Sequence, residues 1–218
     1  MSTSESVFAL GDDALGVRLA TKDRRNAVAQ HLLDSGQWSE VVPGAEGVSV
    51  QFDPLALTPD EAMLALQNAL AQNIAAAEVS AELLVIPVCY SPEYGLDLAH
   101  ISSATGLATD EIIQRHTSQT HHVDMIGFTP GFAYLEGGDP SLDVSRLDTP
   151  RAHLAAGSIG LAGGLCGLYV LPGPGGWPIV GRTPMALFDT ERDDPFRLQV
   201  GQSIRFEAIS VADFKAWR

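Results

Sequence analysis

Lysine is nearly absent from this chain of 218 residues, because Lys22 and Lys215 are the only two. The region between them therefore has no phosphate-loop lysine, no kinase-type lysine and no lysine that could form a Schiff base. The phrases GxxxxGK[ST] and GxGxxG are also missing. An anion bound in this region would have to be held by arginine, backbone N–H groups or helix N-termini.

Cysteine and long apolar runs are scarce as well. Cys89 and Cys166 are the only cysteines and form no CxxC pair, which argues against a zinc knuckle or a disulfide framework and favours a reducing compartment. No run approaches about 18 apolar residues, and the N-terminus has neither a basic stretch nor a long apolar one. We therefore expect a cytoplasmic protein that does not enter a membrane.

Positive charge is also in short supply. The chain has 13 basic and 27 acidic residues, which gives a formal net charge of −14. Such a charge opposes binding to nucleic acid or to an anionic membrane surface, and we expect neither as a partner. The hydrophobic content of 45% is sufficient for one or two buried cores.

The first third of the sequence predicts a small α+β unit. Strands are expected at 7–10 and 14–19 as a hairpin, then a helix at 23–33 that ends before Gly36, then strands at 38–42 and 48–52. Thr58, Pro59 and Glu61 form a capping-box pattern, from which a helix should run to about residue 77.

The character of the sequence changes near residue 82, where we place a domain boundary. A buried strand is expected at 83–88, followed by helices at 96–103 and 110–116, the second with Thr109 as its N-cap. Short strands are then predicted at 123–126, 158–162, 167–171, 179–181, 185–188 and 203–208. The sequence thus predicts an α+β N-terminal domain at 1–82 and a mainly β domain, a barrel or sandwich carrying the ligand cleft, at 83–218.

Three phrases dense in glycine and proline stand out, at 127–135, 156–164 and 172–184. Glycine permits close backbone approach and proline fixes φ, so we expect rigid loops shaped for contact. Phe128, Phe132, Tyr134 and Trp177 lie among these glycines and could line a pocket or a partner surface. Ordinary core packing is the alternative for each of them.

Arginine is the natural candidate for anion recognition. Before the C-terminal tail the second domain has four arginines: Arg115, Arg146, Arg151 and Arg182. We single out Arg151 and Arg182, since each lies beside a glycine-rich phrase and could grip a carboxylate or phosphate, with Ser158 or Thr183 adding a hydroxyl donor. Alternatively, these arginines satisfy loop carbonyls.

Histidines cluster at His116, His121 and His122, close to Asp124. Adjacent residues on a strand point to opposite faces, so this group is a poor metal-ligand set and no metal is expected. His116, near a helix end, is a candidate for proton transfer, although an exposed or core histidine is the alternative. No nucleophile elbow is present, and Cys166 is expected to be a packing residue.

The phrases GFTPGFAYL at 127–135, AGSIGLA at 156–162 and PGGWPIVGRTP at 174–184 closely resemble the 5-oxoprolinase B-subunit family. This family is also called allophanate hydrolase subunit 1 and includes a sporulation histidine-kinase inhibitor. Shorter matches near residues 10–12, 87–98 and 111–116 extend the resemblance over nearly the whole chain.

The resemblance implies a small α+β domain followed by a cyclophilin-like barrel. It also implies ATP-dependent opening of 5-oxoproline to glutamate, with ATP used in the assembled complex. The implied partners are the A- and C-subunits of 5-oxoprolinase, the latter a homologous barrel protein. The alternative is a regulatory protein that inhibits a sensor histidine kinase.

On this basis the candidate catalytic residues are Arg151, Arg182 and His116. The candidate substrate-binding residues are Phe128, Pro130, Phe132, Tyr134, Gly157, Ser158, Trp177 and Thr183. Backbone N–H groups of residues 157–164 are expected to stabilise the developing oxyanion.

The sequence departs from the family pattern at positions that we expect to face the cleft. Leu165-Cys166-Gly167 stands where the family usually has Gln-Thr-Gly, and His121 stands where it usually has tyrosine. Exchanging polar for apolar groups could change which ligand is bound, because a buried polar contact can decide specificity.

Overall fold

The computed structural model describes residues 5–75, 83–192 and 195–217. The chain divides into two compact units, Met1–Glu78 and Val79–Arg218, which are described separately below. The domain boundary predicted between 82 and 83 adjoins residues 76–82, which lie outside the described residues.

The first unit is an antiparallel sheet with two helices. Its elements are β1 (Ser6–Ala9), β2 (Ala14–Arg18), α1 (Lys22–Asp34), β3 (Glu40–Gly44), β4 (Gly47–Gln51) and α2 (Pro59–Leu70). The strand order is β1-β2-β4-β3, and the predicted hairpin of β1 and β2 is confirmed. Apolar side chains of both helices join one core with those of the sheet, so both helices cover the same sheet face.

Local capping explains where these helices begin. The Thr58 side chain accepts from the Glu61 N–H, and the Glu61 carboxylate accepts from the Thr58 N–H, which confirms the capping box. The prediction that α2 runs to about residue 77 is wrong, because the helix ends at Leu70. Ile74 packs against the same core from beyond the helix, and this contact extends the apolar pattern past the helix end.

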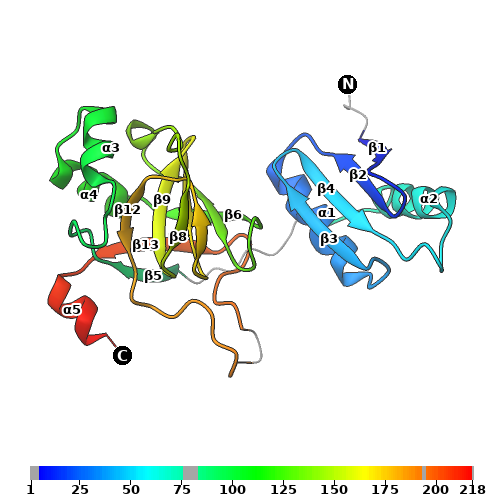
Figure 1. Ribbon diagram of the computed structural model, residues 1–218. Coiled ribbons are helices and arrows are strands. Elements are labelled where there is room, and N and C mark those ends of the chain that lie inside the picture. Colours follow the sequence, from blue (N-terminus) through cyan, green and yellow to red (C-terminus); the bar gives the residue numbers. More distant parts are fainter. Residues whose placement is uncertain (1–4, 76–82, 193–194, 218) are drawn as a thin grey trace. The chain divides into compact units, whose positions relative to one another are not determined.

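The second unit contains a seven-stranded sheet in its described residues. Its strands are β5 (Leu83–Val88), β6 (His121–Ile126), β7 (Ala133–Glu136), β9 (Ser158–Ala162), β10 (Leu165–Leu168), β12 (Ile179–Arg182) and β13 (Ser203–Ala208). The order is β12-β9-β10-β7-β6-β13-β5, antiparallel except between β13 and β5. Cys89, directly after β5, exchanges backbone hydrogen bonds of 2.9 and 3.1 Å with Arg182 of β12. This bridge joins the two edge strands into a nearly closed barrel (Figure 1).

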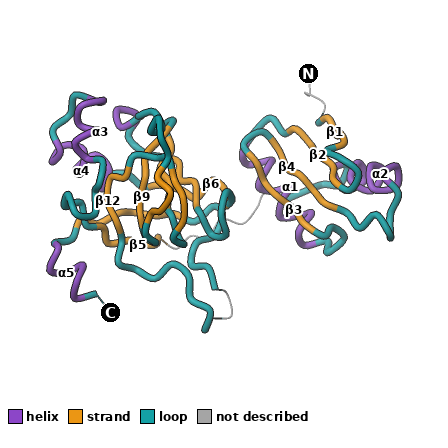
Figure 2. The backbone as a smooth tube through the Cα atoms, in the orientation of Figure 1, coloured by secondary structure: helices purple, strands orange, loops and turns teal. Residues whose placement is uncertain are grey.

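Helices and a small second sheet surround this barrel. The helices are α3 (Leu98–Thr105), α4 (Thr109–Ser118) and α5 (Val211–Ala216), with a 3-10 turn η1 (Pro140–Leu142). They lie at the periphery of the strands (Figure 2), with α3 against β12 and α4 against β13. The small sheet pairs β8 (Arg151–Leu154) with β11 (Gly173–Gly175). None of the helices in the described ranges has the length and hydropathy of a membrane-spanning segment.

Several sequence predictions for this unit need correction. The N-cap of α4 is Ala108, not Thr109, and no strand forms at 185–188. Strands β7, β8 and β11 were not predicted, although β7 and β11 lie within glycine- and proline-rich phrases. Glycine removes the side-chain alternation by which a strand is recognised, so backbone pairing in these phrases leaves little pattern in the sequence.

The barrel strands carry different residues on their two faces. On β7 and β10, Leu135, Cys166 and Leu168 belong to the main hydrophobic core. The alternate positions, Tyr134 and Gly167, point the opposite way, since successive side chains of a strand alternate. A smaller cluster of Phe132, Leu154, Tyr169 and Ile179, with Tyr134 against it, occupies that second face. The candidate site lies there.

Candidate functional site

The hairpin loop between β6 and β7 is built from two tight turns. The Thr129 N–H donates to the Gly127 carbonyl over 2.8 Å, around Phe128 with φ of +67°. The Phe132 N–H then donates to the Thr129 carbonyl over 3.0 Å, around Pro130 and a glycine with φ of +76°, as in a type II turn. Phe128 is the one non-glycine residue with positive φ in the described ranges, and its side chain is 60% exposed. The backbone of Phe128 is therefore strained, and the loop holds the ring of this residue near its tip.

Beneath this loop is a pocket of about 310 Å³. Its wall is formed by the loop, by β7, β9 and β10 with the residues that directly follow β9 and β10, by the segment after η1 and by the segment before β12. The lining residues are Phe128, Phe132, Tyr134, Arg146, Ala162, Gly163, Leu165, Tyr169, Gly176 and Trp177. The pocket thus collects residues from all three glycine- and proline-rich phrases.

Phe132 is the centre of the aromatic wall. Its ring centroid lies 4.8 Å from Tyr134, 4.8 Å from Tyr169 and 5.9 Å from Trp177, each in edge-to-face geometry. A Cβ at Gly167 would lie 2.7 Å from Phe132 and 2.8 Å from Trp177. The absence of a side chain there lets both rings rest directly on the strand.

The polar side-chain groups of the pocket lining are one guanidinium, two phenols and the indole N–H of Trp177. Arg146 is the sole charged residue of the lining. Burial raises the pKa of Tyr134 and of Tyr169, and the charge of Arg146, which lines the same pocket, opposes both shifts. The Trp177 backbone also hydrogen-bonds the Tyr169 hydroxyl and lowers the same pKa. Both phenols are neutral near pH 7 and can donate a hydrogen bond to a ligand.

Arg151, a predicted catalytic residue, lies outside this lining. Its two terminal nitrogens donate to the Asp97 carboxylate over 2.9 and 2.6 Å, and the same carboxylate accepts from the Ile179 N–H over 2.7 Å. Asp97 is buried, and Ile179 follows Trp177 by two residues. Arg151 and Asp97 therefore form a buried clamp that holds the backbone just after Trp177.

Arg182 and Thr183, at the end of β12, are hydrogen-bonded to the loop that precedes β9. The Arg182 Nε donates to the Ala156 carbonyl over 2.8 Å, and the Thr183 N–H donates to the Gly157 carbonyl over 2.9 Å. The Ser158 hydroxyl donates to a backbone carbonyl over 2.7 Å. The structure does not bring Arg182, Gly157, Ser158 or Thr183 to the aromatic pocket, and Pro130 is not among the lining residues either.

The backbone N–H groups expected to receive an oxyanion are already bonded. Those of Gly157, Leu161 and Gly163 donate to carbonyls over 2.7, 2.9 and 3.0 Å. That of Gly164 donates to the Asp143 carboxylate over 2.7 Å. Most of residues 157–164 form the inner strand β9, so these bonded N–H groups are not open donors in this structure, and the oxyanion hole expected there stays a prediction.

His116 lies in the core. It is 1% exposed, its Nδ1 lies 2.7 Å from the Tyr90 hydroxyl, its Nε2 lies 3.6 Å from the Cys166 Sγ, and its ring stacks on Phe206. Burial, with a smaller contribution from His121, holds the pKa of His116 well below its usual value. The imidazole is buried and is not among the residues that line the aromatic pocket, and the role of His116 in proton transfer stays a prediction.

The other histidines of the cluster also point to separate environments. His121 is buried and His122 is exposed, as expected for neighbours on a strand. Within the described residues, no group of three or more His, Cys, Asp or Glu side chains is arranged to hold a metal ion. Burial also raises the pKa of the Cys166 thiol, which leaves it unreactive.

Arg146 and Tyr169 line the pocket but were not predicted as site residues, whereas Leu165, which was expected to face the cleft, does line the pocket. Arg146 carries no local signal, because no glycine-rich phrase adjoins it. Leu165 is one of the departures from the family pattern, and that departure was the signal that marked the position. Cys166, the second departure, instead contacts His116 in the core.

Comparison with known proteins shows that this fold is similar to that of carboxyltransferase domains. The family model described as carboxyltransferase domain, subdomain C and D, matches residues 6–198. The K. lactis urea amidolyase has a similar fold, with a TM-score of 0.77 at 16% identity, over 96% of this chain and 15% of that one. A conserved uncharacterized protein, PH0987 from Pyrococcus horikoshii, matches with a TM-score of 0.60 at 30% identity, over 96% of this chain and all of that one (100%).

Relatives with an assigned name identify the family of this chain more narrowly. A protein of Escherichia coli O157:H7, named as the B-subunit of 5-oxoprolinase, is 36% identical over 191 residues, which are 87% of each chain. A Bacillus subtilis protein of the same name is 38% identical over 141 residues, which span 65% of this chain and 59% of the relative's own length. The chain therefore belongs to the 5-oxoprolinase B-subunit family, as the resemblance of its phrases indicates.

Proposed function

We propose that this protein is a subunit of an ATP-dependent 5-oxoprolinase, which opens the cyclic amide of 5-oxoproline to give glutamate. The observation that carries the proposal is the 36% identity over 87% of both chains with a relative named as the B-subunit of that enzyme. The proposed partners are the A-subunit of the complex, together with its homologous barrel protein, the C-subunit. The proposed location is the cytoplasm. The finer description of the fold, an α+β domain followed by a cyclophilin-like barrel, belongs to the same proposal.

The aromatic pocket supports this function as the place where the substrate ring would bind. Its rings from Phe132, Tyr134 and Trp177 form a flat-sided apolar cavity of about 310 Å³, a size suited to a small cyclic molecule. The neutral hydroxyl groups of Tyr134 and Tyr169 can donate hydrogen bonds to an amide carbonyl. The role of this chain would be to bind and orient the amide.

The same pocket does not suit ATP. A triphosphate needs several cationic groups or a cradle of free N–H groups, whereas this lining has one cation and the N–H groups of nearby β9 are bonded. No lysine lies between Lys22 and Lys215. We therefore propose that ATP is bound outside this pocket in the assembled complex.

Reconstitution tests the proposal. The purified chain is mixed with the two proposed partner subunits, and ATP hydrolysis is measured with and without 5-oxoproline. We expect hydrolysis that depends on 5-oxoproline and requires this chain. A Trp177→Ala variant should raise the KM for 5-oxoproline, because it removes one wall of the pocket. Absence of 5-oxoproline-dependent hydrolysis with all three subunits present would refute the function.

A regulatory role is the second candidate, and the exposed ring of Phe128 favours it. An aromatic side chain that is 60% exposed at the tip of a rigid loop is typical of a contact with another protein. The loop could dock on a sensor histidine kinase. A pull-down with the tagged chain and its Phe128→Ala variant separates the two: the regulatory role predicts a kinase whose capture requires Phe128, and the enzyme role predicts the other subunits.

A further inference from the structure

The charge of the pocket contrasts with the charge of the protein. The chain has a formal net charge of −14, yet the lining holds a single charged residue, which is the cation Arg146. No aspartate or glutamate lines the pocket. A small anion therefore meets attraction inside the pocket that it does not meet over the protein as a whole.

Arg146 has no partner of opposite charge in the described residues, where no hydrogen bond or ion pair of its guanidinium is found. The other two arginines near the glycine-rich phrases, Arg151 and Arg182, are taken up by Asp97 and by the Ala156 carbonyl. Arg146 is thus the arginine that can offer its paired N–H groups to a ligand.

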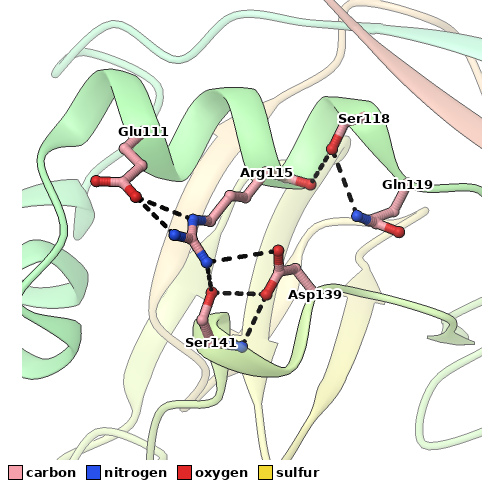
Figure 3. Close-up of polar contacts among 6 residues, drawn as sticks. All are labelled: Glu111, Arg115, Ser118, Gln119, Asp139 and Ser141. Carbon is pink, nitrogen blue, oxygen red and sulfur yellow. Dashed lines mark hydrogen bonds and ion pairs between the residues drawn. The ribbon is translucent and has the colours of Figure 1, made fainter.

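The segment that carries Arg146 is anchored at both ends, next to the pocket. Its amino-terminal end is the turn η1, where Arg115 of α4 donates to Ser141 over 2.7 Å and pairs with Asp139 at 3.7 Å (Figure 3). Its carboxyl-terminal end is fixed by the Leu147 N–H, which donates to the carbonyl of the lining residue Gly176 over 2.8 Å.

Between these ends the segment is also tied to the turn after β9. The Gly163 N–H donates to the Val144 carbonyl over 3.0 Å, and the Gly164 N–H donates to the Asp143 carboxylate over 2.7 Å. The backbone of Arg146 is thus fixed against two parts of the lining, and a guanidinium on fixed backbone loses less freedom when it binds.

The surroundings of the guanidinium define the rest of the ligand. Arg146 lies close enough to Tyr134 and Tyr169 to oppose the rise of their pKa values. An Nη atom of Arg146 would lie 3.7 Å from a Cβ built on Gly176, directly before Trp177. A ligand held by Arg146 would therefore lie in a lining that also contains the phenols of Tyr134 and Tyr169 and the ring of Trp177.

We infer that Arg146, with Tyr134 and Tyr169, forms a carboxylate subsite, so that the pocket binds small ring compounds that carry one carboxylate. The guanidinium grips the carboxylate, the phenols donate hydrogen bonds, and Phe132 and Trp177 pack against the ring. The identity of 5-oxoproline as the natural ligand rests on the function proposed above, whereas the carboxylate subsite is a property of this chain alone.

Matched ligand pairs test the subsite on the full chain by saturation-transfer NMR titration. One pair is 5-oxoproline and 2-pyrrolidinone, which lacks the carboxylate, and the other is cyclopentanecarboxylate and its neutral carboxamide. We expect each carboxylate to bind at least about 10-fold more tightly than its partner, as for a charge-assisted hydrogen bond. Inorganic phosphate is titrated as the other anion that an arginine can hold.

Three variants locate the effect. Arg146→Gln should weaken carboxylate binding about 10- to 100-fold, and Arg146→Lys should restore part of it, since a point charge remains without the planar fork. Arg205→Gln is the matched control, because it removes the same charge from an exposed position on β13 and should leave binding unchanged. Thermal unfolding of each variant checks that the fold is retained.

Several results would overturn the inference. The wild type could bind neither carboxylate, the neutral partners could bind as tightly, or a folded Arg146→Gln variant could bind as well as the wild type. Phosphate binding that equals carboxylate binding and depends on Arg146 would make this a phosphoryl site instead.

The reconstituted enzyme separates this inference from the proposed function. Carboxylate binding through Arg146 without 5-oxoproline-dependent ATP hydrolysis would keep the subsite and reject the activity. Full hydrolysis by Arg146→Gln with an unchanged KM for 5-oxoproline would keep the activity and reject the subsite.

Discussion

Substitution of Asp97 should destabilise the barrel unit by an amount that depends on which hydrogen bonds are lost. The carboxylate accepts two bonds from Arg151, at 2.9 and 2.6 Å, and one from the Ile179 N–H, at 2.7 Å. Asp97→Asn keeps an oxygen that can accept from Ile179 but loses the two-pronged ion pair. Asp97→Ala loses all three bonds.

The expected magnitudes follow from burial. Asp97 is 8% exposed in its side chain and Arg151 is 31% exposed, so water can replace part of what Arg151 loses. Asp97→Asn should therefore lower the free energy of unfolding by about 2 kcal/mol, within the range for charge-assisted hydrogen bonds. Asp97→Ala also leaves the Ile179 N–H without its acceptor and should lower it by about 4 kcal/mol, as for a broken buried pair.

Urea unfolding followed by tryptophan fluorescence measures both values. A Trp38→Phe background removes the fluorophore of the first unit, so that Trp177 and Trp217 report on the second. A loss of about 2 kcal/mol should lower the midpoint by about 1 M urea. The matched control is Glu93→Gln, which makes the same chemical change in an exposed pair with Lys215 and should cost less than about 1 kcal/mol.

Two results would refute this reasoning. Asp97→Asn could unfold at the same midpoint as the Glu93→Gln control, in which case the buried clamp contributes no more than a surface pair. Alternatively, Asp97→Ala could be no less stable than Asp97→Asn, and then the hydrogen bond from the Ile179 N–H makes no measurable contribution to the free energy of unfolding.

Three further predictions concern the pocket and the core. Gly167→Ala should displace Trp177 and weaken 5-oxoproline binding more than about 10-fold by NMR titration, whereas Gly173→Ala, with open space around its Cβ, should not. Leu165→Gln, which restores the family's polar residue, should change the ratio of 5-oxoproline to cyclopentanecarboxylate affinity in favour of the amide. Burial lowers the pKa of His116 in the folded state, so the free energy of unfolding should fall as pH drops below about 6.5, where the unfolded chain binds the proton. His116→Gln should reduce this dependence of the unfolding free energy on pH, as measured by urea titrations at several pH values.

Local sequence rules predicted helices α1 to α4 and several strands because their causes are local, whereas α5 was not predicted. The Thr58 capping box and the Gly36 turn depend on residues within a few positions, and both are present in the structure. The strand at 83–88 was predicted to the residue because its side chains are apolar throughout. By contrast, β7 and β11 pair through backbone in phrases whose glycines and prolines suggest loops.

The aromatic residues of the pocket could also be predicted from local sequence. Aromatic rings that alternate with glycines pack against the backbone that the glycines leave uncovered. Phe128, Phe132, Tyr134 and Trp177 all line the pocket. The sequence alone does not indicate whether a given side chain of β9 or β10 points to the core or to the pocket. Leu165 therefore reaches the pocket while its neighbour, the cysteine, enters the core.

The choice among arginines depends on pairing across long sequence separations. Arg151 meets a carboxylate that lies 54 positions earlier in the chain, and it does so because Asp97 begins α3 beside β12 in the folded barrel. Arg182 bonds a carbonyl 26 positions away. An arginine in a glycine-rich phrase is therefore as readily recruited to hold that phrase together as to bind a ligand. Arg146 lies outside the phrases, on a segment whose backbone is already tied down, and this arrangement leaves its guanidinium available to the pocket.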